Sequence, residues 1–102
     1  MIHVIATVNL VAGRRDDFLA RFRQVMPLVH DEPGCIEYGP TLDVATDIPA
    51  QGGVRPNVVT IVERWESLAD LQAHLVAPHM LAYRADVKEM VERTTLQILE
   101  PV

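Results

Sequence analysis

The segment that most constrains the fold is residues 2–11, IHVIATVNLV, which has the pattern of a β-strand with apolar side chains on both faces. It is rich in β-branched residues and contains neither glycine nor proline. Side chains of a strand point alternately to its two faces. One face here is wholly apolar, and the other mixes aliphatic side chains with His3, Thr7 and Asn9. A sheet built around this strand therefore needs cover on both sides.

A helix is expected from about residue 14 to residue 30. Asp16 and Asp17 suit the positive end of such a helix. Pro27 is expected to kink it or to tighten its last turn, and the run at residues 31–34 is expected to end it. Its apolar residues recur at helical spacing and form one stripe: Phe18, Phe22, Val25, Met26 and Val29.

Two further strands are expected at residues 35–44 and 58–65. Gly39 and Pro40 predict a bulge or an edge position in the first of them, because proline cannot donate a ladder hydrogen bond. The intervening loop, residues 45–57, is long for a hairpin. Long loops in small domains often serve function, here as a pocket lid or a dimer contact, and a tolerated insertion is the alternative.

Two helices and a last strand complete the chain. Ser67 suits the N-cap of a helix carrying Leu68, Leu71 and Leu75. Pro78 suits the first position of a second helix, which would bear Met80, Leu81, Val87, Met90 and Val91. Residues 94–100 have the pattern of a strand. The order predicts a single α+β domain over residues 1–102, of the ferredoxin-like β-α-β-β-α-β type.

This arrangement leaves one face of the sheet without helices. The helices of such a domain lie on one side of an antiparallel sheet, and the chain has no further element for the other side. A second copy of the sheet is the simplest cover. We therefore expect a homodimer, a dimeric α+β barrel in which two antiparallel sheets pack face to face.

The charge pattern argues against several classes of partner. The formal net charge is -5, and no run of basic residues is longer than Arg14-Arg15. Nucleic acid and anionic membrane surfaces would both call for a basic patch. No apolar run approaches the length of a membrane span, and no signal peptide is visible. We expect a cytoplasmic protein without membrane insertion, and a pocket ligand that is neutral and apolar.

Redox and cofactor signals are sparse. The single cysteine, Cys35, cannot form an internal disulfide and is expected to be a small buried hydrophobe. The chain contains no G-x-G-x-x-G, P-loop, C-x-x-C or H-E-x-x-H motif. Neither a nucleotide, a flavin nor a metal ion is therefore expected as a cofactor.

His74 and His79 are the first candidates for chemistry, because histidine exchanges protons near neutral pH. Their spacing across Pro78 is not the i, i+4 pair that clamps a metal on one helix. Tyr83 lies one helical turn after His79, so both could form a cavity wall with Met80. The alternatives are histidines bonded to backbone at a helix break and a tyrosine packed between helix and sheet.

Four more polar residues could line a pocket that is otherwise apolar. Asn9 sits in mid-strand, where an amide needs a buried hydrogen bond or a ligand, and Tyr38 sits in the second strand. Glu63 and Trp65 share a face of the third strand. A carboxylate beside an indole in an apolar pocket would have a raised pKa and could act as a base. The alternative is a surface Glu63 with Trp65 packed in the core.

Three stretches resemble the antibiotic biosynthesis monooxygenase domain, and within it the bacterial quinol monooxygenases. They are E-P-G-C-I-E-Y-G-P (32–40), I-V-E-R-W-E-S-L-A-D-L-Q-A-H-L-V-A-P-H-M-L-A-Y (61–83) and L-Q-I-L-E-P (96–101). The resemblance covers nearly the whole chain. It implies a dimeric ferredoxin-like fold, an apolar pocket in each subunit and oxygen chemistry without metal, haem or flavin.

Branches of that family differ in their site residues. The haem-degrading branch has an Asn in the first strand, which Asn9 matches, but its Trp and His positions fall on His74 and near Arg84. The polyketide-tailoring branch oxidises phenolic ring systems with an Asn, a Trp and a Tyr near the pocket, and Asn9 and Trp65 could correspond to the first two. A third branch isomerises small phosphorylated signalling sugars and would want a basic cradle, which the sequence does not show.

The resemblance thus implies a cofactor-free monooxygenase that acts on quinols or related phenolic aromatics with dioxygen. His74 or His79 would take the phenolic proton, and Asn9 or Tyr83 would bond the ring oxygens. Trp65, Met80, Tyr38 and Glu63 would complete the substrate pocket. The rival interpretations are a non-catalytic dimer that binds quinones, a dimer with a vestigial pocket, and a family isomerase.

Overall fold

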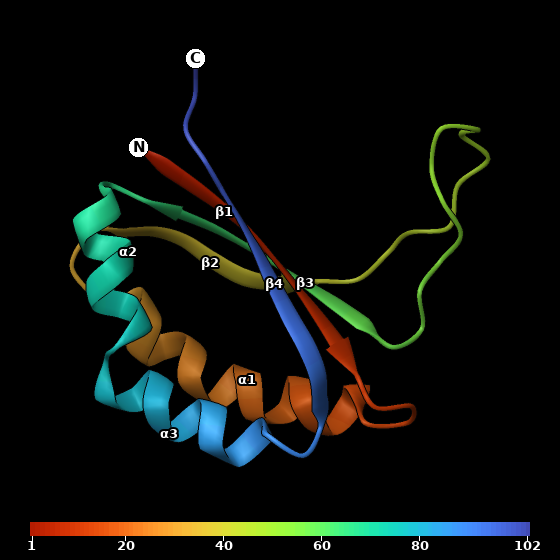
Figure 1. Ribbon diagram of the computed structural model, residues 1–102, viewed down its shortest axis with the longest axis horizontal. Coiled ribbons are helices and arrows are strands. Elements are labelled where there is room, and N and C mark those ends of the chain that lie inside the picture. Colours follow the sequence, from red (N-terminus) through yellow and green to blue (C-terminus); the bar gives the residue numbers. More distant parts are fainter.

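The computed structural model describes all of residues 1–102 (Figure 1). Its elements follow the order β-α-β-β-α-α-β, in which the two late helices are separated by a break before Pro78. The elements are β1 (Ile2–Leu10), α1 (Arg15–His30), β2 (Cys35–Thr41), β3 (Val58–Trp65), α2 (Leu68–Leu75), α3 (Pro78–Val87) and β4 (Val91–Leu99).

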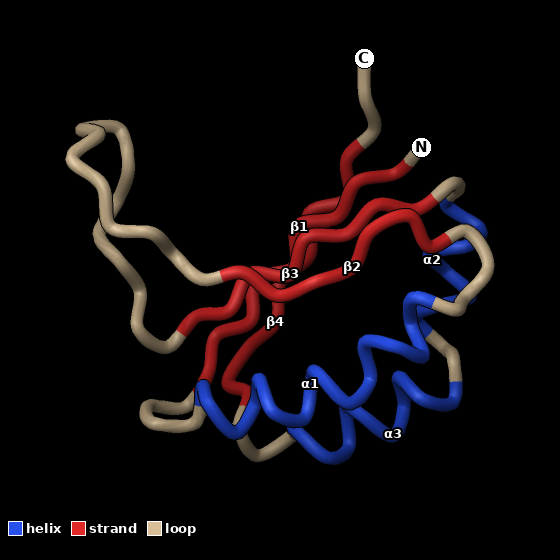
Figure 2. Tube along the Cα trace, turned by 180° about the vertical axis from the view of Figure 1, so that it is seen from behind, coloured by secondary structure: helices blue, strands red, loops and turns tan.

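The four strands form one sheet in the order β2-β3-β1-β4, and every neighbouring pair is antiparallel. The helices all lie on one side of this sheet (Figure 2). The predicted α+β ferredoxin-like fold is therefore confirmed. None of the helices is both long and apolar enough to cross a membrane.

The core lies between the helices and one face of β1. Alternate β1 residues from Ile2 to Leu10 are buried, whereas those between them are half-buried. From α1, Phe18 and Phe22 are fully buried and stack with ring centroids 6.0 Å apart. Burying a side chain of this size stabilises a fold by roughly 2–3 kcal/mol. The amphipathic stripe predicted for the first helix thus holds the helical layer on the sheet.

Element boundaries differ from the prediction at the end of β2 and at the start of β4. β2 ends at Thr41, and β4 begins at Val91, a residue that helical spacing assigns to the second late helix. The reason is tertiary: Val91 pairs with Leu10, so the backbone of β1 draws these residues into the sheet. Pro27 lies inside α1, which continues to His30. β2 is an edge strand, which is one of the two outcomes predicted from Gly39 and Pro40, and its irregularity falls between Cys35 and Glu37.

The side of the sheet away from the helices has no cover within the chain (Figure 2). Its central pair is Ile5 of β1 opposite Val62 of β3, both half-buried. The loop between β2 and β3 extends away from the body of the molecule (Figure 1). It carries four exposed aliphatic residues: Leu42, Val44, Ile48 and Val54.

Candidate active site

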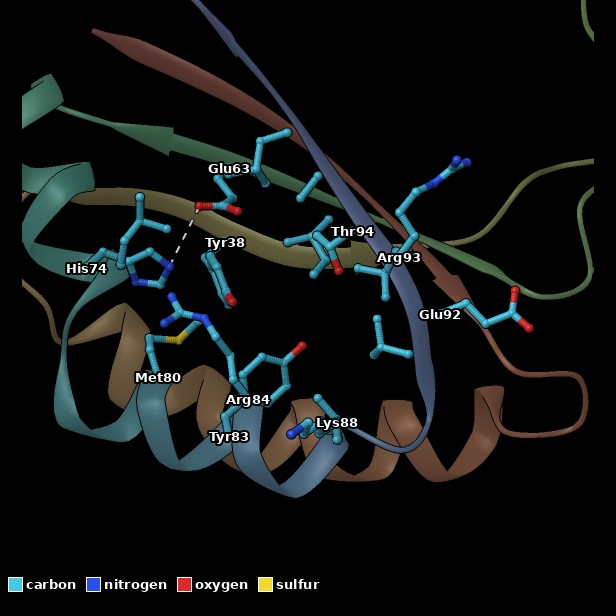
Figure 3. Close-up of a pocket in the computed structure, with 17 residues that line it drawn as sticks. Tyr38, Glu63, His74, Met80, Tyr83, Arg84, Lys88, Glu92, Arg93 and Thr94 are labelled. Carbon is cyan, nitrogen blue, oxygen red and sulfur yellow. Dashed lines mark ion pairs between the residues drawn. The ribbon is translucent and has the colours of Figure 1, made fainter.

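A cavity of about 530 Å³ lies between the sheet and α3, within the range of roughly 300–1,000 Å³ typical of small-molecule sites. Its walls come from all four strands and from both late helices (Figure 3). Ten of its seventeen lining residues are hydrophobic, which suits a flat, largely apolar ligand. The predicted site residues that line it are Tyr38, Glu63, His74, Met80 and Tyr83.

The polar part of this cavity lies where β3 meets α2. Glu63 and His74 are the two buried polar or charged residues of the chain, with 5% and 2% of their surface exposed. Figure 3 shows the two side chains facing each other, and His74 Nε2 lies 4.0 Å from Glu63 Oε1. A ligand oxygen placed beside them would reach both groups.

Glu63 is held by Trp65, two residues further along β3. The indole Nε1–H of Trp65 donates a hydrogen bond of 2.9 Å to Glu63 Oε1. Burial raises the pKa of the Glu63 carboxyl to about 7, against the lowering effect of the indole bond and with a smaller contribution from the charge of Glu32. Glu63 therefore exchanges a proton near neutral pH. The alternative of a surface Glu63 is wrong.

His74 is enclosed by aromatic rings and one carboxylate. Its ring lies 4.6 Å from the Trp65 ring and 5.3 Å from the Tyr38 ring, measured between centroids. Its Nδ1 lies 2.9 Å from Glu32 Oε2. Burial lowers the pKa of His74, and its hydrogen bond to the Glu32 carboxylate opposes this effect. His74 is therefore neutral at neutral pH and able to accept a proton.

His79 does not line the cavity. Its Nε2 lies 2.8 Å from the same oxygen, Glu32 Oε2, and its side chain is 24% exposed. Neither histidine bonds to backbone, which was the alternative interpretation. The structure brings the two predicted histidines together, but through the carboxylate of Glu32, which the sequence analysis did not select.

The turn that carries Glu32 is locked onto the start of α2. Gly34 has a φ of +79°, and a Cβ at this position would overlap the carboxylate of Asp70. The carbonyl of Gly34 accepts a 2.9 Å hydrogen bond from the amide of Glu66. Ser67 caps α2 by accepting from the amide of Asp70, as predicted. These contacts place Glu32 against His74, one helical turn beyond Asp70.

Asn9 lies on the other face of the sheet, so the expectation that it joins this cavity is wrong for a single chain. The cavity is lined by Ala6 and Val8 of β1, and side chains alternate along a strand. Asn9 therefore points with Thr7 toward the open face. It pairs across the sheet with Val58 and Arg93.

Trp65 lies behind the cavity wall, fully buried, where it fixes Glu63 and packs on His74. Two cations that were not among the predicted site residues line the cavity: Arg84 of α3 and Lys88, the C-cap residue of that helix, one helical turn further on. Neither forms a salt bridge. Figure 3 shows Arg84 extending from α3 toward His74. Their i, i+4 spacing after Met80 was the available signal.

Cys35 is half-buried and unpaired, and it does not line the cavity. Burial raises the pKa of its thiol, and the charges of Glu32 and Glu63 raise it further. A protonated thiol is a poor nucleophile, so Cys35 contributes packing to the core. No group of three or more His, Cys, Asp or Glu residues is placed to hold a metal ion.

The fold and site together define a ferredoxin-like α+β domain with an apolar small-molecule cavity and a buried histidine between two carboxylates. Residues 1–86 match the family model described as antibiotic biosynthesis monooxygenase. The chain therefore belongs to the antibiotic biosynthesis monooxygenase family. The resemblance inferred from the sequence is confirmed, and a monooxygenase-type function is supported.

Individual relatives agree with this assignment. The chain is 38% identical over 103 residues to a protein of Escherichia coli K12 named probable quinol monooxygenase YgiN, covering 99% of this chain and 98% of that one. A crystal structure of an antibiotic biosynthesis monooxygenase has the same fold, with a TM-score of 0.82, 20% identity and coverage of 100% and 99%. The structure of Rv0793 from Mycobacterium tuberculosis also has this fold, with a TM-score of 0.76 and 26% identity. The match covers 99% of this chain and 94% of that one.

Proposed function

We propose that this chain is a cofactor-independent monooxygenase that acts on quinols or related phenolic aromatics with dioxygen. The observation that carries the proposal is the buried His74, which faces Glu63 at the polar end of an otherwise apolar cavity. The name of the E. coli relative supports the substrate class. The cavity volume of about 530 Å³ suits a ring system of two or three fused rings.

Removal of a phenolic proton is the first step. A quinol reduces dioxygen poorly until it is deprotonated, and neutral His74 accepts that proton at Nε2. The carboxyl of Glu63, whose pKa is about 7, forms a hydrogen bond to an oxygen atom of the quinol or shares the phenolic proton with His74. The Arg84 guanidinium stabilises the quinolate that forms. Apolar walls from Met80, Leu96 and their neighbours keep water from the ring.

The quinolate then transfers electrons directly to dioxygen. In the full reaction the quinol and dioxygen give a hydroxyquinone and water. One oxygen atom forms a new carbon–oxygen bond and replaces a ring hydrogen, and the other leaves as water. Of the four electrons that reduce dioxygen, two come from conversion of quinol to quinone and two from hydroxylation of the ring carbon.

We propose further that the chain works as a homodimer whose open sheet faces pack together. The uncovered pair Ile5 and Val62 supports this assembly, as does the exposed Leu99 of β4, which pairs with His3 on the same face. In such a barrel Asn9 lies between the two sheets instead of in the cavity. The cytoplasm is the proposed location.

Oxygen uptake with chemically reduced naphthoquinones tests the proposed activity. The wild type should consume oxygen faster than the quinol does alone, and with ¹⁸O₂ one labelled atom should appear in the product. His74→Ala should fall to the rate of autoxidation, because a positioned general base contributes roughly 100- to 10,000-fold. His3→Ala, on the opposite face of the sheet, serves as the matched control and should retain activity.

Two results would count against this function. If the wild type consumes oxygen no faster than the free quinol, yet quenches Trp65 fluorescence saturably on adding quinone, the chain is a quinone-binding protein. If hydrogen peroxide accumulates in place of a labelled product, the chain is an oxidase and not a monooxygenase.

A further inference from the structure

Glu32 is the one carboxylate in the chain that contacts two histidines. It lies in the turn between α1 and β2, forty-two residues before His74 and forty-seven before His79. Its Oε2 is 2.9 Å from His74 Nδ1 and 2.8 Å from His79 Nε2, and its side chain is only 10% exposed. Burying a carboxylate is costly unless it is hydrogen-bonded, so this contact constrains both histidines.

We propose that Glu32 is a positioning residue that holds His74 with its proton on Nδ1 and its free Nε2 toward the cavity. We propose also that His79 secures Glu32 and is not itself the base. The consequence for catalysis rests on the proposed function. The two histidines, which are equal candidates for the base in the sequence, therefore have different roles.

The choice of tautomer follows from hydrogen-bonding roles. An ionised carboxylate has no proton to donate, so a ring nitrogen that bonds to it must carry the hydrogen. Neutral imidazole has one N–H, and in His74 that hydrogen lies on Nδ1, which faces Glu32. The lone pair therefore lies on Nε2, the nitrogen 4.0 Å from Glu63 Oε1 at the cavity.

The groups around His74 decide how strongly it takes up a proton. Glu32 from the α1–β2 turn and Glu63 from β3 are negative or become so, and both favour the imidazolium. Arg84 and His79, from α3, oppose it when charged. The neighbouring rings of Tyr38 and Trp65 carry no charge. Because Glu32 is the charge in direct hydrogen-bond contact, its removal lowers the basicity of His74.

His79 plays a different part because it faces outward. It opens α3 directly after Pro78, does not line the cavity and is 24% exposed. Its Nε2–H donates to Glu32 Oε2, the oxygen that also accepts from His74 Nδ1. This bond keeps the Glu32 side chain in its orientation within a partly buried turn. A donor of similar reach at this position should replace it.

Nitrogen-15 spectra of histidine-labelled protein test the assignment without any substrate. Long-range nitrogen–proton correlations distinguish the two neutral tautomers. In the wild type at pH 8, His74 should show a protonated Nδ1 and an unprotonated Nε2. In Glu32→Gln the amide donates to Nδ1, so the proton should move to Nε2. A wild-type His74 with its proton on Nε2 would overturn the proposal.

Kinetics with a reduced naphthoquinone give the second readout. Glu32→Gln should lower kcat at least about 100-fold with little change in KM, whereas Glu32→Asp should recover part of the loss. In Glu32→Asp the acidic limb of the pH profile should stay near that of the wild type. In Glu32→Gln it should move to lower pH, because the charge that raises the His74 pKa is gone.

Two further variants separate positioning from a structural effect. His79→Gln keeps a donor toward Glu32 and should lose less than about 10-fold in kcat, whereas loss equal to that of His74→Ala would mean that His79 is the base. Glu89→Gln, an exposed carboxylate on the turn after α3, should match the wild type. The inferred tautomer in a wild type without quinol turnover would contradict the proposed function and support the role of Glu32.

Discussion

At the scale of residues, the site gains its chemistry from two neighbouring groups whose pKa values burial moves in opposite directions. Burial favours the neutral form of each, so the pKa of Glu63 rises to about 7 and that of His74 falls. At neutral pH His74 is therefore largely neutral, and Glu63 is partly neutral. A neutral histidine accepts a proton from a phenol, and a carboxyl that titrates nearby can share it.

Glu63→Gln should make stability less dependent on pH. The ordinary pKa of 4.5 describes the unfolded carboxyl, and about 7 describes the folded one. The folded state therefore gains from this group below pH 4.5 and loses that gain as pH rises through 7. The variant should gain about 2 to 3 kcal/mol on the wild type between pH 5 and pH 8.

Urea unfolding of both proteins at the two pH values checks this prediction. The amide of Gln keeps an oxygen for the Trp65 Nε1–H, so packing is conserved. His74 is present in both proteins, and its own pH dependence cancels in the difference. Equal slopes of stability against pH in the two proteins would show that Glu63 titrates in the folded state as it does in the unfolded chain.

Contacts between site residues could be predicted from the sequence only where the two residues are close to each other along the chain. Glu63 and Trp65 share a strand face by simple alternation, and the sequence therefore paired them correctly. Glu32 meets His74 across forty-two residues, and no spacing rule reports such a contact. Alternation already placed Asn9 on the strand face opposite Ala6 and Val8, but the sequence did not show which face of the sheet bears the cavity, and Asn9 was therefore misplaced.

At the scale of elements, the α1–β2 turn and the start of α2 act as one unit. The sequence indicated that the turn ends a helix and that Ser67 caps the next, and both features are present. It did not indicate that Gly34 lies against Asp70, because the two are brought together only by the packed fold. The site depends on this contact, since it fixes the backbone of Glu32.

Gly34→Ala should destabilise the protein by about 2 to 3 kcal/mol. The residue has a φ of +79°, which disfavours any side chain, and the added methyl group overlaps the Asp70 carboxylate. Gly13→Ala is a matched control, because its φ is +82° but its Cβ would meet nothing within 4 Å. It should lose only about 1 kcal/mol.

Chemical denaturation gives both values, and kcat provides a separate check on the turn. If the turn positions Glu32, Gly34→Ala should lower kcat even where the protein stays folded, and Gly13→Ala should not. Equal destabilisation by the two substitutions would show that the turn moves away from Asp70 at little cost.

At the scale of the whole molecule, helices cover one face of the sheet and leave the other face, the open face, without cover. The aliphatic pattern of β1 predicted the covered face correctly. The open face is more polar than the pattern of β1 alone indicated, because its neighbours across the strands include Thr60, Arg64, Arg93 and Gln97. Sequence alternation identifies two faces but not the residues that neighbouring strands add to each.

Ile5→Asp should convert the proposed homodimer into monomers. Ile5 lies opposite Val62 in the middle of the open face, so two sheets packed face to face would bury the new carboxylates close to one another. The dimer dissociation constant should rise at least about 100-fold, which corresponds to roughly 3 kcal/mol. Sedimentation equilibrium at micromolar concentration measures the change, and circular dichroism confirms that the monomer keeps its fold. Leu81→Asp, on the exposed side of α3, is the matched control and should remain dimeric. A wild type that sediments as a monomer would contradict the dimer, because the open face would then be stable in water.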